Sequence, residues 1–176
     1  MDLRDVEGED AEAILAIYSH YVKTSVATLQ EDLPTLESIC NNIERLKSID
    51  MPFVVAVDKS NGQIAGYAYG DVFNERSGYK NTVEDSVYIH KDYTARRLGK
   101  LLLKEVFARL KAMGKKVVIA KMSILPNVRS EDMATCRLHA SLGAREVGRM
   151  LKVGYKLGTL VDVIIFQLDL EDFEAS

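Results

Sequence analysis

Residues 82–103 combine a strand pattern, a tight turn and a helix pattern within one short stretch of the chain. The strand part alternates apolar with polar side chains, so that a carboxylate, Glu84, lies in an otherwise apolar segment. The helix part repeats apolar residues at steps of three and four, which predicts one buried face made of Leu98, Leu101, Leu102, Val106, Leu110 and Met113. Because the first-turn amides of a helix are free to bind an anion, this junction is a predicted pyrophosphate site.

Composition excludes several classes of protein. The 176 residues fit one domain, 1–176, and 47% hydrophobic with 28% charged residues is ordinary for a soluble globular chain. A net charge of −3 leaves no basic surplus for binding a nucleic-acid backbone. No apolar run approaches the roughly 18 residues of a membrane-spanning helix. We therefore expect neither nucleic acid nor membrane as a partner.

The cysteines and the first residues indicate a reducing compartment. Cys40 and Cys136 lie in helix-like patterns without metal-ligand spacing, which favours reduced, partly buried thiols. Three dispersed histidines predict no metal site. Met-Asp-Leu-Arg-Asp at residues 1–5 lacks the pattern of a leader peptide, so we expect a cytoplasmic location.

The remaining patterns predict the element order β-α-α-β-β-β-α-β-α-β-β. The expected elements outside 82–113 are strand 2–6, helix 9–22, a helix that Pro34 opens, strands 52–58 and 63–72, strand 116–122, helix 130–142, and strands 146–153 and 160–170. The turn Lys-Ser-Asn-Gly at 59–62 predicts an antiparallel hairpin. The helix before strand 116–122 predicts one parallel crossover. The expected fold class is α/β (α+β), a mixed sheet of about seven strands with helices on both faces.

Several short strings share an order and spacing with a known family. They lie at 13–18, 20–22, 24–28, 79, 82–90, 137–139, 142–143, 145–148, 154–156, 158 and 162. Together they resemble the GNAT superfamily of acyl-CoA-dependent N-acetyltransferases, and within it the phosphinothricin and methionine sulfoximine acetyltransferases. The resemblance implies an acetyl-CoA cosubstrate, a small amino-acid-like amine as acceptor, a homodimer to which residues 144–170 contribute, and no metal.

The acyl-CoA signature of that family, Arg/Gln-x-x-Gly-x-Gly/Ala, falls on Thr94, Arg97 and Gly99, of which only the glycine is kept. Glycines there let backbone amides approach the pyrophosphate, and Arg96 and Arg97 offer charge-assisted contacts instead. The alternative is that both arginines form a solvated basic turn. The predicted cofactor-binding residues are Val87, Tyr88, Ile89, Thr94, Ala95, Arg96, Arg97, Leu98, Gly99 and Lys100.

Two residues are candidates for the proton transfers. The resemblance implies that Glu84 is the general base, because loss of hydration in an apolar strand makes a carboxylate a better proton acceptor. The alternative is an ion-paired glutamate at the sheet margin. His139 occupies the place of a tyrosine that protonates the departing thiolate in many family members, but a lone histidine in a helix can also be structural. A backbone amide near Tyr88 is expected to stabilise the carbonyl oxygen.

The predicted acceptor-binding residues are Thr28, Arg76, Tyr79, Thr82 and Lys156. Arg76 suits an anionic group of the acceptor, although it can equally be a solvated loop charge. Departures from the family at Leu29, Asp132, Ala144 and Leu160 affect the shape of this pocket more than the reaction. Two other hypotheses stay open, a non-catalytic acyl-CoA-binding module and an acetyltransferase for another amine.

Overall fold

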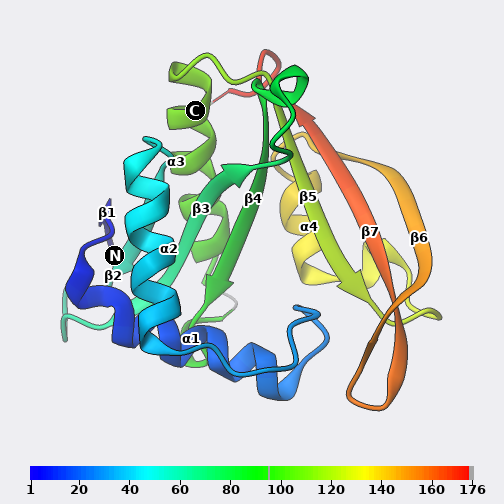
Figure 1. Ribbon diagram of the computed structural model, residues 1–176, viewed down its shortest axis with the longest axis horizontal. Coiled ribbons are helices and arrows are strands. Elements are labelled where there is room, and N and C mark those ends of the chain that lie inside the picture. Colours follow the sequence, from blue (N-terminus) through cyan, green and yellow to red (C-terminus); the bar gives the residue numbers. More distant parts are fainter. Residues whose placement is uncertain (95, 175–176) are drawn as a thin grey trace.

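A computed structural model describes residues 1–94 and 96–174 as a mixed sheet with helices on both faces (Figure 1). The strand order is β1-β2-β3-β4-β5-β7-β6. The main elements are β1 (Asp2–Asp5), α1 (Ala11–Thr24), α2 (Leu36–Ser48), β2 (Phe53–Val57), β3 (Ile64–Val72), β4 (Thr82–Ile89), α3 (Leu98–Ala112), β5 (Val117–Ile124), α4 (Ala134–Ala140), β6 (Arg145–Lys156) and β7 (Thr159–Asp169). The predicted fold class and element order are confirmed.

The side chains of β3 and β4 show which helices cover which face of the sheet. Tyr88 of β4 packs against the rings of Tyr18 and Tyr21, so α1 covers the face to which Tyr88 points. On the opposite face, Gly70 lies against Leu110 of α3, where an added Cβ would come within 3.2 Å of the leucine methyl carbons. Helices α1 and α2 therefore cover one face, and α3 and α4 the other (Figure 1).

Helix α3 is largely buried, but its predicted apolar face needs a correction. The buried positions are Leu98, Leu102, Leu103, Val106, Phe107 and Leu110. Leu101 and Met113 are instead 48% and 41% exposed. The buried stripe follows steps of four from Leu98 and adds its neighbours at 103 and 107, which turns residues 101 and 113 toward solvent. The helix ends as predicted at Gly114, which has a φ of +79°.

Three predicted helix starts were also wrong. The helix expected from residue 9 begins at Ala11, after a 3-10 turn at Gly8–Asp10. Thr35, not Pro34, caps α2, because its side chain accepts a hydrogen bond from the Ser38 amide while Ser38 reaches back to the Thr35 amide. The predicted helix 130–142 is a 3-10 turn at Ser130–Asp132 followed by α4, because Met133 has extended backbone angles. The strands at 52–58 and 63–72 form the expected antiparallel pair.

Strand β6 forms an edge of the sheet, and its outer surface carries apolar side chains. Leu151, Val153, Tyr155 and Leu157 in the β6–β7 hairpin are each more than half exposed. We call these four residues the hairpin patch. An apolar group of this kind on an edge strand is typical of an interaction surface.

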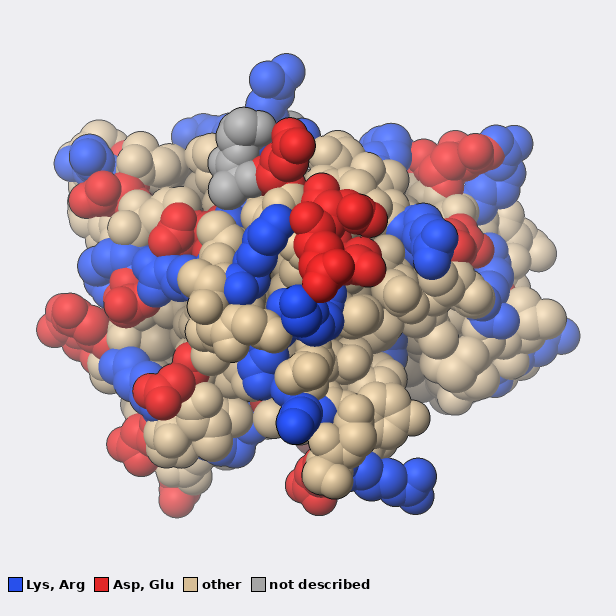
Figure 2. All heavy atoms as spheres, turned by 90° about the horizontal axis from the view of Figure 1, so that it is seen from above, with Lys and Arg blue, Asp and Glu red and all other residues tan. Residues whose placement is uncertain are grey.

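Charged side chains of both signs are mixed on the face in Figure 2, where an acidic group lies among lysines and arginines. That face shows no continuous basic stripe of the kind that binds nucleic acid. Among the residues that the structure describes, no helix is both long and apolar enough to span a bilayer.

Candidate active site

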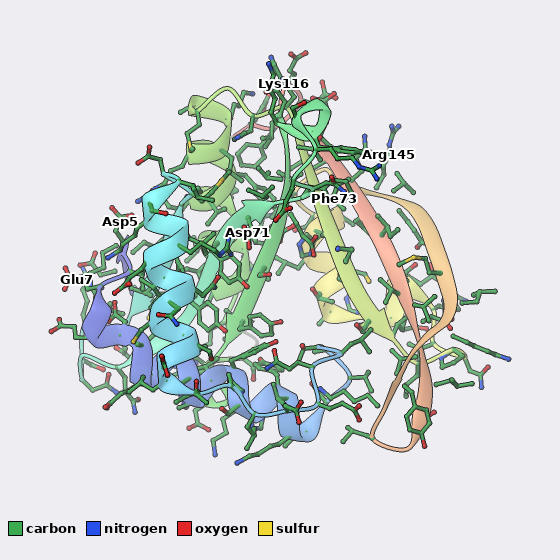
Figure 3. The ribbon with its side chains drawn as sticks, in the orientation of Figure 1. Asp5, Glu7, Asp71, Phe73, Lys116 and Arg145 are labelled. Atoms are coloured by element: carbon green, nitrogen blue, oxygen red, sulfur yellow. The ribbon has the colours of Figure 1, made fainter. Side chains whose placement is uncertain are left out.

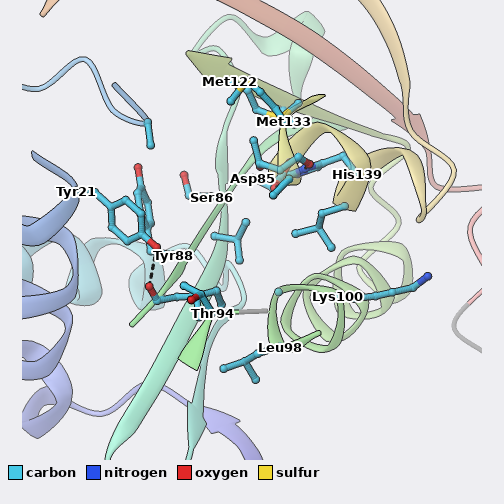
Figure 4. A pocket seen from close by; sticks show the side chains of 18 of the residues that line it. Tyr21, Asp85, Ser86, Tyr88, Thr94, Leu98, Lys100, Met122, Met133 and His139 are labelled. Carbon is cyan, nitrogen blue, oxygen red and sulfur yellow. Dashed lines mark hydrogen bonds and ion pairs between the residues drawn. The ribbon is translucent and has the colours of Figure 1, made fainter. Parts of the chain in front are cut away.

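A cavity opens where β4 and β5 separate. Thr82–Glu84 of β4 pair in parallel with Val117–Ile119 of β5. Beyond these residues the two strands diverge (Figure 1). The cavity has a volume of about 440 Å³. Its walls come from β4 and β5, the start of α3, and the segment 133–139 that includes α4 (Figure 4). A depression of this size between splayed strands, with a helix N-terminus on its wall, suits an elongated anionic ligand.

The predicted cofactor-binding residues gather on this wall. Nine of the ten line the cavity: Val87, Tyr88, Ile89, Thr94, Arg96, Arg97, Leu98, Gly99 and Lys100. Ala95 lies outside the described residues. Arg97 adopts the left-handed conformation, with φ +58°, and is the N-terminal cap of α3. The family's glycine position is therefore one where a side chain is tolerated at some conformational cost.

Gly99 has a packing role that the sequence did not indicate. A Cβ at this position would lie 2.8 Å from Cδ2 of Leu138 in α4. The glycine thus allows α3 to approach α4, in addition to any approach of a ligand to the backbone. Retention of this glycine, when Thr94 and Arg97 depart from the signature, is consistent with a requirement for close helix packing.

Arg97 offers a direct test of the altered signature. We expect Arg97→Gly to weaken acetyl-CoA binding by about tenfold, because the charge-assisted contact to phosphate that the sequence predicts for this side chain would be lost. The free energy of unfolding should change by less than about 1 kcal/mol, since glycine relieves the positive φ but adds entropy to the unfolded chain. Calorimetry on Arg97→Gly and on the charge-retaining control Arg97→Lys measures both effects. Tighter binding by the glycine variant would show that the native side chain hinders the ligand.

Glu84 lies at the point where β4 and β5 part, on the face that α1 and α2 cover. Its Oε2 is 2.7 Å from Nζ of Lys121 on β5, and its side chain is 28% exposed. The ion-paired glutamate of the alternative interpretation is thus present. A paired carboxylate at the mouth of the split can still accept a proton, so the catalytic role stays a prediction.

His139 and Asp85 form a buried pair on the other face of the sheet. Nε2 of His139 is 2.9 Å from Oδ2 of Asp85, and the two side chains are 3% and 1% exposed. Burial lowers the pKa of His139, but the charge and hydrogen bond of Asp85, together with the Thr135 carbonyl, outweigh it and leave that pKa raised. Figure 4 shows the two side chains pointing toward each other at one end of the cavity.

Sequence reasoning missed Asp85, although a signal was available. The residue shares the alternation of Val83 and Val87, which places its carboxylate on the buried face. It also missed Lys121, because the partner of Glu84 comes from a strand 37 positions later in a chain of 176 residues. Pairing across the split strands is a tertiary feature that local periodicity does not contain.

The predicted acceptor residues fall into two groups, neither of which lines the large cavity. Nζ of the buried Lys156 donates to the carbonyl oxygen of Thr28, which ties the β6–β7 hairpin to the loop after α1. Burial lowers the pKa of Lys156. Thr28 Oγ1 also lies 3.0 Å from the Tyr18 hydroxyl oxygen, on the same face as Tyr88.

The second acceptor group precedes β4. Arg76 and Tyr79 are exposed in and beside the short 3-10 turn at 77–79, and Thr82 begins β4 two residues before Glu84. The Tyr79 ring packs against Phe73, with 5.4 Å between centroids. Phe73 in turn lies 6.0 Å from the Lys121 ammonium, and Figure 3 places Asp71 and Phe73 where β3 ends. This turn therefore borders the Glu84–Lys121 pair.

Metal and thiol chemistry receive no support from the geometry. No group of three potential metal-ligating side chains occurs among residues 1–94 and 96–174. Both cysteines are free thiols, as expected. Burial raises the pKa of the Cys136 thiol to about 11, so this sulfur is a poor nucleophile.

Comparison with known proteins identifies the class. The Acetyltransferase (GNAT) family model matches residues 14–144. A phosphinothricin N-acetyltransferase from Alcaligenes faecalis is 32% identical over 96% of this chain and 82% of its own length. An L-methionine sulfoximine/L-methionine sulfone acetyltransferase from Salmonella typhimurium is 31% identical over 99% of this chain and 98% of its own.

A solved structure extends the similarity to the fold. A GNAT superfamily phosphinothricin acetyltransferase from Sinorhizobium meliloti, in complex with acetyl-CoA, superposes with a TM-score of 0.89 at 31% identity. The match covers 99% of this chain and 91% of that one. The fold and the split-strand cavity thus define an acetyltransferase. The chain belongs to the Acetyltransferase (GNAT) family.

Proposed function

We propose that this enzyme transfers an acetyl group from acetyl-CoA to the α-amine of a small amino-acid-like acceptor of the phosphinothricin or methionine sulfoximine type. The observation that most directly supports this proposal is the cavity between β4 and β5, whose wall includes the N-terminal turn of α3. The named activities of the relatives support the choice of acceptor. A cytoplasmic location and a single domain at 1–176 stay predictions.

The residues on the cavity wall fit the cosubstrate. Acetyl-CoA supplies an activated thioester when it is bound. Amides of the first turn of α3 bind its diphosphate, and Arg96 and Arg97 add positive charge beside them. The Arg96 guanidinium carbon already lies 5.0 Å from the Tyr93 ring centroid, which limits its side-chain freedom.

Glu84 acts as the general base on the face of the sheet that α1 and α2 cover, opposite α3 and α4. The acceptor approaches from the side of α1 and α2, and Glu84 takes the ammonium proton, either directly or through one water. A backbone amide near Tyr88 stabilises the carbonyl oxygen. Arg76, Tyr79 and Thr82 lie on the segment that leads to Glu84 and bind the acidic group of the acceptor. Thr28 and Lys156 hold the loop that closes the same face.

An acetylation screen tests this function. Purified protein is mixed with acetyl-CoA and a thiol reagent across amino acids, their phosphinyl and sulfoximine analogues, and polyamines. Release of thiol that requires an amino-acid-like acceptor supports the proposal. Release with polyamines alone changes the acceptor class. Binding of acetyl-CoA without turnover supports the non-catalytic module, which the left-handed Arg97 in an altered signature makes the second candidate.

We further propose that the enzyme is a homodimer that uses the hairpin patch. Leu151 is 69% exposed on edge strand β6, which is unusual for so large an apolar side chain. We expect Leu151→Lys combined with Val153→Glu to convert a dimer to a monomer in size-exclusion chromatography with light scattering. Leu101→Lys, an equally apolar exposed site on α3, is the control and should leave the mass unchanged. A wild-type monomer at all concentrations would contradict the proposal.

A further inference from the structure

The geometry of His139 restricts how this residue can act. Its Nδ1 is 2.8 Å from the Thr135 carbonyl oxygen, which accepts only, so Nδ1 carries a hydrogen. Its Nε2 is 2.9 Å from Oδ2 of Asp85. Both ring nitrogens are therefore engaged inside the protein. His139 has no nitrogen left to meet a ligand in the cavity.

Asp85, unlike His139, has an atom that is still free to contact a ligand. Its side chain is 1% exposed, and Oδ1 is the one buried side-chain oxygen or nitrogen without a hydrogen-bond partner among the described residues. An unpaired buried acceptor is unfavourable, so it marks a place where a partner from outside the chain is expected. Asp85 also belongs to the cavity wall, one strand position before Ser86 and two before Val87. Within the pair, the hydrogen-bonding atom that has no partner is thus Oδ1 of the aspartate.

We propose that Asp85 is the residue that delivers a proton to the departing sulfur, and that His139 is its positioning residue. This inference rests on the proposed acetyl transfer. It replaces the expectation that His139 protonates the thiolate directly, because in this structure the imidazole does not offer a free N–H to the cavity.

The proposed transfer conserves protons and electron pairs. The acceptor nitrogen bonds to the acetyl carbonyl carbon, and the carbon–sulfur bond breaks with its electron pair left on sulfur. The proton between Nε2 and Oδ2 moves onto the Asp85 carboxyl, and a half turn about Cβ–Cγ presents it to the sulfur. The ammonium loses two protons in all. One leaves through Glu84 to solvent, and the other, also through solvent, restores the pair.

Other ionisable groups around the pair do not substitute for it. Lys100 donates from Nζ to the Ser141 carbonyl oxygen, and Glu84 lies on the other face of the sheet paired with Lys121. Tyr88 points to the face that α1 covers, away from Asp85, and burial raises its pKa, which makes its hydroxyl a weak acid. The titratable residues that share the cavity wall or helix α4 with the pair are Tyr21, Tyr88, Tyr93, Arg96, Arg97, Lys100, Lys121, Cys136 and Arg137.

Three variants separate the two roles kinetically. We expect Asp85→Asn to lower kcat by about 10²-fold with KM for acetyl-CoA changed less than threefold, because a general acid is lost and binding is not. His139→Gln keeps a donor toward Oδ2 but holds no transferable proton, so Asp85 must take its proton from solvent, and kcat should fall only about tenfold. Asp85→Glu restores a carboxyl and should recover at least tenfold over Asp85→Asn.

A readout without acetyl-CoA tests the pair itself. Imidazole NMR of the unliganded protein should show His139 titrating above its ordinary value of 6.5 in the wild type and below it in Asp85→Asn, where only the hydrogen bond to the Thr135 carbonyl still opposes the effect of burial. The pH above which kcat falls should shift in the same direction as the His139 pKa. Asp10→Asn is the matched control, since Asp10 is a buried aspartate paired with Arg4 away from the cavity. It should change stability but neither the His139 titration nor the pH profile.

The outcomes are decisive in both directions. Greater loss in Asp85→Asn than in His139→Gln, with recovery in Asp85→Glu and the shifted titration, supports the assignment. Loss in His139→Gln equal to or greater than that in Asp85→Asn overturns it, as does an Asp85→Asn enzyme within threefold of wild type. Wild-type protein that acetylates no acceptor defeats the proposed function instead, and the NMR titration still shows whether the pair holds the proton.

Discussion

Replacing Glu84 by glutamine is expected to lower kcat by about 10²-fold or more near neutral pH, with little change in the affinity for acetyl-CoA. Glutamine keeps the size of the side chain but cannot accept a proton from an ammonium group, and general base catalysis contributes about this factor. The affinity should persist because Glu84 is not among the residues on the cavity wall. Steady-state kinetics and calorimetry on the same preparation measure the two quantities.

The position of Glu84 makes the control important. Its ion pair with Lys121 is also lost in the variant, and a loss of structure alone could slow the enzyme. Glu105→Gln provides the match, because Glu105 pairs with Arg109 on α3 and lies outside the cavity wall. It should retain full turnover. A Glu84→Gln enzyme as fast as Glu105→Gln would leave Glu84 with the ion pair as its sole role.

The order of the elements could be predicted because its signals are local. Alternation in strands, turn residues at 59–62 and Gly114 at the end of α3 each depend on a few neighbouring residues. The predictions that were wrong concern features that tertiary packing determines. Leu101 fits a helical repeat but faces solvent, since α3 buries the stripe that meets β2 and β3. Residues 130–132 were assigned to a helix because their polarity does not distinguish a 3-10 turn from a first helical turn.

The site was predictable only in part, for the same reason. The strand-to-helix turn is continuous in sequence, so nine of the ten residues predicted there lie on the cavity wall, and their role in binding the cosubstrate stays a prediction. The contacts of Asp85 with His139, and of Thr28 with Lys156, join segments 54 and 128 positions apart. A buried aspartate in the apolar half of an alternating strand indicates that a partner exists, but no pattern along the chain identifies it.

The largest stability effect is expected at Arg149, which joins the β6–β7 pair to the loop before α4. Its Nε donates to Oδ2 of Asp162 at 2.8 Å, and its other nitrogens donate to the carbonyl oxygens of Leu125, Pro126 and Val128. Asp162 is 1% exposed, and its Oδ1 also accepts from the Lys152 amide at 2.7 Å. Removal of the guanidinium leaves a buried carboxylate half paired and three carbonyls without this donor.

We expect Arg149→Met to lower Tm by on the order of 10 °C, measured by calorimetry. Arg45→Met is the control, because it breaks the ion pair between Asp71 and Arg45, whose side chain is 47% exposed. It should lower Tm by at most about 3 °C. The hydrogen bond from Lys152, and then Arg149, lowers the pKa of Asp162 below its ordinary 3.8.

The sign of that shift adds a pH test. A depressed carboxyl pKa contributes stability that is present above the ordinary value and is lost as pH falls through the folded value. Wild-type protein should therefore lose Tm more steeply than Arg149→Met as pH falls below about 4, so the gap between the two narrows in acid. Equal melting temperatures for Arg149→Met and Arg45→Met at neutral pH, or a gap that widens in acid, would show that Asp162 draws its stability from the Lys152 amide and that the loop is held in another way.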